Sequence, residues 1–83
     1  MPRHGNTLKG LDLLLGDVCR ELGFCNRLTG AELLPPGGTL NSTEFAEAVV
    51  RAENMNPEYE PKWMRQIRDR FEARFGASIS LPG

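Results

Sequence analysis

The segment Pro61–Gly76, PKWMRQIRDRFEARFG, decides the fold, because it has the features of one complete amphipathic helix. Its large apolar residues repeat at intervals of three and four positions and therefore share one helix face: Met64, Ile67, Phe71 and Phe75. Proline suits the first helical position, and glycine suits the position just after the last turn. The pattern predicts a helix over residues 61–75 that buries this apolar face.

A second helix is predicted over residues 7–22. Its apolar residues follow the same spacing and form one stripe: Leu8, Leu11, Leu15, Val18 and Leu22. Thr7 is suited to cap the start of this helix, and Gly23 is suited to the left-handed conformation just past its end.

A third helix is predicted over residues 42–54, where the start signal is the clearest in the chain. Asn41 is the expected N-cap, and Glu44 then stands at the third helical position, which completes a capping box. Leu40 before the cap and Phe45 at the fourth position are placed to form a hydrophobic staple. Both signals agree on one starting point.

Residues 24–34, which lie between the predicted helices over residues 7–22 and 42–54, are compatible with two structures. Thr29 and Glu32 could cap a single helical turn that Pro35 ends. The same residues could instead form a small hairpin, with the SISL segment near the C-terminus pairing beside it. We favour the helical turn. The expected fold is mainly α, a three-helix single domain over residues 1–83, which a marginal short β pairing near residues 24–30 and 78–81 would supplement.

Composition limits the functional classes. Apolar residues make up 40% of the 83 positions and charged residues 25%, as in an ordinary folded soluble domain. Ten Lys and Arg against eleven Asp and Glu give a net charge of −1, so an overall positive field for nucleic acid or an anionic membrane is absent. The start of the chain lacks the pattern of a signal peptide, and no apolar run approaches the ~20 residues of a membrane span. We expect a cytoplasmic protein that does not contact membranes.

The helix over residues 61–75 nevertheless carries half of the basic residues: Lys62, Arg65, Arg68, Arg70 and Arg74. On a helical wheel, Arg70 and Arg74 flank Trp63 at the edge of the apolar face. The other three lie on the polar side among acids, where two i,i+4 ion pairs are expected: Arg65–Asp69 and Arg68–Glu72. A surface that follows phosphates needs its basic residues together and free of acids, so most of this helix does not qualify.

Arg70 and Arg74 are like charges four residues apart, without an acid at the flanking positions of their own helix. Two explanations remain open. Acids of another helix could match them on antiparallel packing, either Asp17 with Glu21 or Glu44 with Glu47. Alternatively, Trp63, Arg70 and Arg74 form a docking ridge for a partner, since Trp and Arg are enriched among residues that dominate interface energies.

We therefore expect a small non-catalytic protein–protein interaction module, binding another protein or itself as a homodimer through Trp63, Arg70 and Arg74. Leu13, which falls outside the stripe of its helix, is either a lone exposed leucine or part of a subunit contact. The alternative is a nucleic-acid-binding accessory protein that uses the basic helix through Arg65, Arg68, Arg70 and Arg74. Against it, the connection ENMNPEYEP is longer than the 3–4 residue turn of a helix-turn-helix.

Neither a cofactor nor a metal ion nor a catalytic residue is expected. Cys19 and Cys25 do not make a disulfide framework, and a reducing compartment disfavours a bridge between them. Cys19 is then an inert buried thiol, and Cys25, near Arg27, is the more reactive one. Only His4 could join them at zinc, which leaves such a site short of its four ligands.

Overall fold

The computed structural model describes residues 3–82, and their side chains from residue 7 onward. The fold is mainly α with one small antiparallel sheet, which confirms the expected fold class. In chain order the elements are α1 (Arg3–Leu22), α2 (Gly30–Leu33), β1 (Thr39–Asn41), α3 (Ser42–Ala52), the 3-10 turn η1 (Pro57–Tyr59), α4 (Pro61–Phe75) and β2 (Ser78–Ser80).

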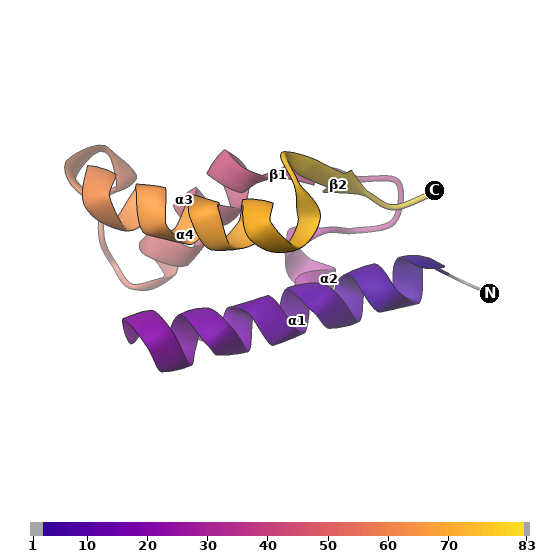
Figure 1. Ribbon diagram of the computed structural model, residues 1–83, viewed down its shortest axis with the longest axis horizontal. Coiled ribbons are helices and arrows are strands. Elements are labelled where there is room, and N and C mark those ends of the chain that lie inside the picture. Colours follow the sequence, from indigo (N-terminus) through magenta and orange to yellow (C-terminus); the bar gives the residue numbers. More distant parts are fainter. Residues whose placement is uncertain (1–2, 83) are drawn as a thin grey trace.

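The molecule is elongated and measures 39 × 22 × 21 Å. Its long helices lie in two groups, with α3 and α4 together and α1 alone beneath them (Figure 1). α3 lies behind α4, and α1 runs beneath them along most of the length of the molecule. The course of the chain in Figure 1 shows that α1 and α4 run in opposite directions. The two-stranded sheet lies at the end of the molecule where α1 begins.

α4 spans the range that the sequence predicts, and it buries the predicted face. Ile67 and Phe71 are fully buried, whereas Met64 and Phe75 are partly buried against the same core. The Phe71 ring lies 5.3 Å from the ring of Phe45 on α3 and 5.2 Å from that of Phe75. Aromatic burial therefore joins α3 to α4 at the centre of the molecule.

α1 begins at Arg3, four residues before the predicted start, so the expectation that Thr7 caps this helix is wrong. The buried stripe is also wider than predicted, because Leu14 is buried together with Leu11 and Val18. The reason is that α1 has neighbours on two sides, α2 on one and α4 on the other. A helix in such a corner buries more than one narrow stripe.

The predicted capping boxes are both confirmed. At the start of α3, the Glu44 amide donates to Asn41 Oδ1 at 2.7 Å, and the Asn41 amide donates to Glu44 Oε1 at 3.0 Å. At the start of α2, Thr29 and Glu32 exchange the equivalent two bonds, each at 3.2 Å. The helical turn after residue 29 is therefore the correct alternative.

The β pairing expected between residues 24–30 and 78–81 is wrong in its first partner. β2 pairs with β1, with Leu40 opposite Ile79. Two amides of the segment after α1 are bonded locally and are therefore not available to a partner strand. The Phe24 amide donates to the Val18 carbonyl at 3.4 Å, and the Leu28 amide donates to Asn26 Oδ1 at 3.0 Å.

The contact between α1 and α2 depends on Gly30, which is buried. Its amide donates to Asp12 Oδ1 at 2.7 Å, and a Cβ at this position would lie 2.8 Å from the Leu8 carbonyl oxygen. Backbone at that distance cannot move aside as a flexible side chain would. Only glycine therefore allows α2 to lie this close to α1.

We predict opposite effects for two glycine-to-alanine substitutions. Gly30→Ala should lower the free energy of unfolding by about 1–3 kcal/mol, because the added methyl group collides with α1 backbone. Gly16→Ala should raise it by up to about 1 kcal/mol, since the helix gains propensity and the new Cβ meets only the mobile end of Arg20, 3.3 Å away. Urea unfolding followed by circular dichroism measures both, and equal effects of the two substitutions would contradict the packing described.

Candidate functional site

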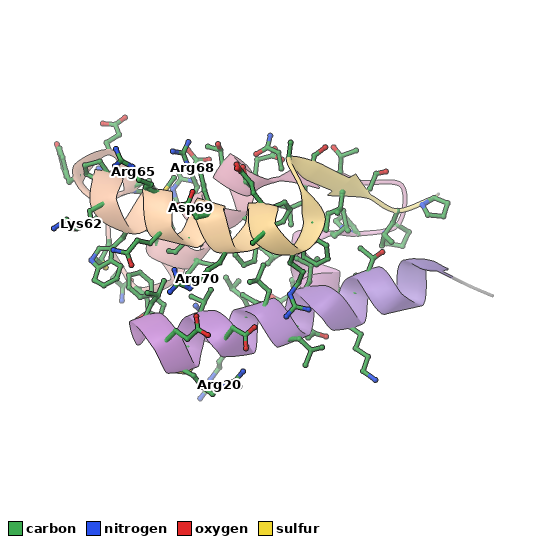
Figure 2. All side chains as sticks on the ribbon, viewed as in Figure 1. Arg20, Lys62, Arg65, Arg68, Asp69 and Arg70 are labelled. Atoms are coloured by element: carbon green, nitrogen blue, oxygen red, sulfur yellow. A yellow bond between two sulfur atoms is a disulfide. The ribbon has the colours of Figure 1, made fainter. Side chains whose placement is uncertain are left out.

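Acids on α1 match the two arginines that are unpaired on their own helix. Arg70 Nε donates to Glu21 Oε1 at 2.9 Å, and Arg74 Nη2 donates to Asp17 Oδ2 at 3.2 Å. Figure 2 shows the Arg70 side chain directed from α4 toward α1. Of the two pairs of acids considered from the sequence, the pair on α1 is the one used. A step of four residues on one helix matches a step of four on the other, and the antiparallel direction decides that Asp17 pairs with Arg74 and Glu21 with Arg70.

These four side chains line an open groove between α1 and α4, of about 330 Å³, which we call the α1–α4 groove. Its lining is Leu14, Asp17, Glu21, Arg70, Ala73 and Arg74. Asp17 also pairs with Arg20 on its own helix. Side-chain exposure ranges from 29% for Asp17 to 54% for Glu21, so the ion pairs remain accessible to solvent and to a partner. The groove has acids along one wall and arginines along the other.

Trp63 closes the α1–α4 contact at the end where α1 finishes. Its ring lies 4.9 Å from the ring of Phe24, with the two planes at 57°. Phe24 is only 6% exposed, whereas Trp63 is half-buried. The predicted docking residues Trp63, Arg70 and Arg74 thus all contact α1 or the residue that follows closely after it. A role in binding a partner stays a prediction for the parts of these side chains that remain exposed.

The alternative set for nucleic acid does not lie on one surface. Figure 2 shows Arg65 and Arg68 on the side of α4 away from α1, whereas Arg70 points toward α1. Within the described side chains, Arg68 Nε is buried without a hydrogen-bond partner. The role of Arg65, Arg68, Arg70 and Arg74 in nucleic-acid binding also stays a prediction.

The expected ion pairs Arg65–Asp69 and Arg68–Glu72 do not form. Among the side chains of residues 7–82, the ion pairs within 4.0 Å are Asp17–Arg20, Glu21–Arg70 and Asp17–Arg74. Glu72 instead accepts a hydrogen bond from Ser42 Oγ at 2.7 Å, which ties α4 to the first residue of α3. Ser42 is 7% exposed, so its hydroxyl needs a partner inside the protein.

The expectation of two free thiols is wrong, because Cys19 and Cys25 form a disulfide. Gly23 has φ +81° and reverses the chain just past the end of α1, which brings the two Cα atoms to 4.3 Å. This distance lies just below the usual range of about 4.4–6.8 Å between the Cα atoms of a disulfide. The left-handed Gly23 was predicted from the sequence, but the bridge was not, because the reducing compartment that we expected disfavours it.

Leu14 and Ala73, which form the floor of the α1–α4 groove, were not identified from the sequence. A signal for Leu14 was present, since it stands three residues after Leu11 and four before Val18. The side chain of His4 lies outside the described residues.

Over the part of the chain that the structure describes, no group of three or more His, Cys, Asp or Glu side chains is arranged to hold a metal ion. In that same part, the helices are all too short or too polar to cross a bilayer. Comparison of the chain with protein-family models, with curated proteins and with solved structures finds no match.

We predict that the pairs across the α1–α4 groove contribute modestly to stability. In a double-mutant cycle of Glu21→Gln and Arg70→Gln, the coupling free energy should be 0.2–1 kcal/mol and should fall as salt is added, because both groups are partly exposed. The same cycle with Arg65→Gln in place of Arg70→Gln is the control and should show no coupling. Coupling above 2 kcal/mol would contradict an exposed pair.

Proposed function

We propose that this protein is a non-catalytic interaction module whose partner is a second copy of the chain, bound face to face through the α1–α4 groove. One observation carries the proposal. The groove has two acids on its α1 wall and two arginines on its α4 wall, at matching positions along the helices. This arrangement is complementary to itself.

The complementarity follows from two-fold symmetry. If the second copy is turned by 180° about an axis parallel to the helices, in the plane of the groove's open face, its α1 lies over the first copy's α4. The same rotation places its α4 over the first copy's α1, as an isologous contact requires. Asp17 of each copy then faces Arg74 of the other, and Glu21 faces Arg70. Each carboxylate lies between two guanidinium groups, so the charges alternate across the interface.

Apolar groups near the groove support the same contact. Leu14 and Ala73 line the floor, and Leu13, one helical turn before Asp17, is 51% exposed. The half-buried Trp63 lies at one end of the α1–α4 contact. The long face of the molecule, 39 by 22 Å, is large enough for the ~600 Å² per partner that the smaller specific interfaces bury.

The acids of the groove favour a protein partner over nucleic acid. A phosphate that approached Arg70 or Arg74 would also approach Glu21 and Asp17, which are bonded to these arginines. Electrostatic binding to a phosphate backbone requires basic groups without adjacent acids.

We also propose a cytoplasmic location, where disulfides are mostly transient and redox-active.

A charge exchange tests the proposal. The variant Asp17→Arg/Glu21→Arg has an all-basic groove, and the variant Arg70→Glu/Arg74→Glu has an all-acidic one. Each should be monomeric alone because like charges face each other, and an equimolar mixture should form a salt-sensitive heterodimer. Sedimentation equilibrium measures the masses, and thermal unfolding checks that both variants are folded.

Wild-type protein that stays monomeric at every accessible concentration would contradict the proposal, as would dimers of either variant alone. Arg70→Gln/Arg74→Gln, which introduces no repulsion, provides the same test if the reversed variants do not fold. This neutral variant should dimerise more weakly than the wild type.

A second prediction concerns the exposed leucine. Leu13→Gln should weaken self-association on the order of tenfold, because a two-fold dimer loses the same apolar contact twice. Tyr59→Gln is the matched control, since Tyr59 is 76% exposed on η1 and does not line the groove. Both substitutions should leave the unfolding free energy within about 0.5 kcal/mol of the wild type. Equal dimer dissociation constants for the two variants would remove Leu13 from the interface.

A further inference from the structure

We infer that Cys25 is a site of thiol–disulfide exchange, at which a small anionic thiol of the glutathione class forms a mixed disulfide and releases Cys19 as a free thiol. This inference goes beyond self-association and concerns a different groove. It rests on the position of the disulfide, on the exposure of its two halves and on the residues around Cys25.

The two halves of the disulfide differ in accessibility. Cys25 is exposed in the loop after α1, whereas Cys19 is half-buried on the helix itself. Exchange begins when a thiolate attacks one sulfur and the other sulfur departs. The Sγ of the exposed Cys25 is therefore the atom attacked, and Cys19 is the leaving group. Exposed disulfides are also the ones that exchange most readily.

Cys25 opens onto a groove of about 400 Å³, which we call the Cys25 groove. It is lined by Cys25, Asn26, Arg27, Leu28, Glu32, Ala52 and Glu53. This volume is within the range of sites that hold small molecules. The loop after α1, α2 and the end of α3 together form its walls.

The charges of the Cys25 groove suit a thiol that carries both carboxylates and an amine. The exposed Arg27 offers a guanidinium group to a carboxylate. Glu32 Oε1 already accepts from the Thr29 amide and hydroxyl. Glu53 remains as the acid that faces a ligand ammonium group. A peptide thiol such as glutathione has these groups on either side of its sulfur.

The exchange balances without an external oxidant. The incoming thiol loses its proton to water, its sulfur bonds to Cys25 Sγ, and the electron pair of the Cys19–Cys25 bond passes to Cys19 Sγ, which takes up a proton. The reverse step is attack of the Cys19 thiolate on the mixed disulfide, and acid stops this step by keeping the thiol protonated.

The adduct also alters the contact at Trp63. Phe24 stands directly before Cys25, and the bridge holds this short loop against the end of α1. Opening the bridge frees the loop that presents Phe24 to Trp63, the single tryptophan of the chain. Tryptophan emission should therefore change in step with the adduct.

The experiment is to incubate the oxidised, folded protein with reduced glutathione, quench with acid, alkylate free thiols and map the peptides by mass spectrometry. The expected product carries glutathione on Cys25 and the alkylating group on Cys19, and it forms together with a shift in Trp63 emission. Glutathione on Cys19, or a disulfide that reacts only after unfolding, would overturn the inference.

A substitution in the Cys25 groove shows whether the groove binds the anionic thiol or whether Cys25 reacts only because it is exposed. Arg27→Gln should slow adduct formation several-fold with glutathione but leave the rate with 2-mercaptoethanol unchanged, because the neutral thiol makes no use of the guanidinium group. Arg65→Gln, on the far side of α4, is the matched control and should change neither rate. An Arg27 effect of the same size for both thiols would overturn the assignment of an anionic thiol.

Discussion

The antiparallel contact of α1 with α4 is the interaction on which the remaining structure depends. α1 has two internal glycines, Gly10 and Gly16, each of which costs about 1 kcal/mol relative to alanine, so packing must hold this helix. Burial of Leu11 and Val18 contributes more than the exposed pairs across the groove, since a fully buried aliphatic side chain contributes about 1.5–3 kcal/mol and an exposed ion pair at most about 1 kcal/mol. Apolar burial therefore holds α1 in place, and the ion pairs select its register. At Gly10 a Cβ would lie 3.1 Å from the Phe75 ring, so the glycine that weakens the helix also brings α4 close.

The packing of α1 against α4 determines the electrostatic character of the α1–α4 groove. Because the helices are antiparallel, Asp17 pairs with Arg74 and Glu21 pairs with Arg70, and the two steps of four residues match. The result is one acidic and one basic wall, with little net charge between them. A surface of this kind does not attract a polyanion, but it complements its own copy turned by half a revolution. The ion pairs of Arg70 and Arg74 with the α1 acids within one molecule thus produce the alternating charges that a second copy could recognise.

Features that depend on neighbouring residues were predictable from the sequence, and those that depend on tertiary packing were not. The capping boxes at Asn41 and Thr29 each lie within four residues, so their signals are complete in the local sequence. The pairing of Leu40 with Ile79 joins segments far apart in the chain, and many apolar segments could have competed for it. For the candidate site, the sequence showed that Arg70 and Arg74 have no acidic partner on their own helix. Which acids match them was not apparent, because α1 carries acids four residues apart and α3 carries acids three residues apart, and only the packing of the helices decides between them.

The disulfide is compatible with a fold that persists without it. A bridge that closes so short a loop stabilises a protein by only about 2 kcal/mol in the chain-entropy model, whereas a domain of this length is stable by roughly 4–12 kcal/mol. The buried leucines of α1 and the Phe45–Phe71 contact do not involve either cysteine. Opening the bridge therefore acts locally, on the loop that presents Phe24 to Trp63, while the helices stay packed. Since Trp63 and the α1–α4 groove lie along the same face of α4, a chemical change at Cys25 is physically connected to the surface through which we propose that the chain binds its copy.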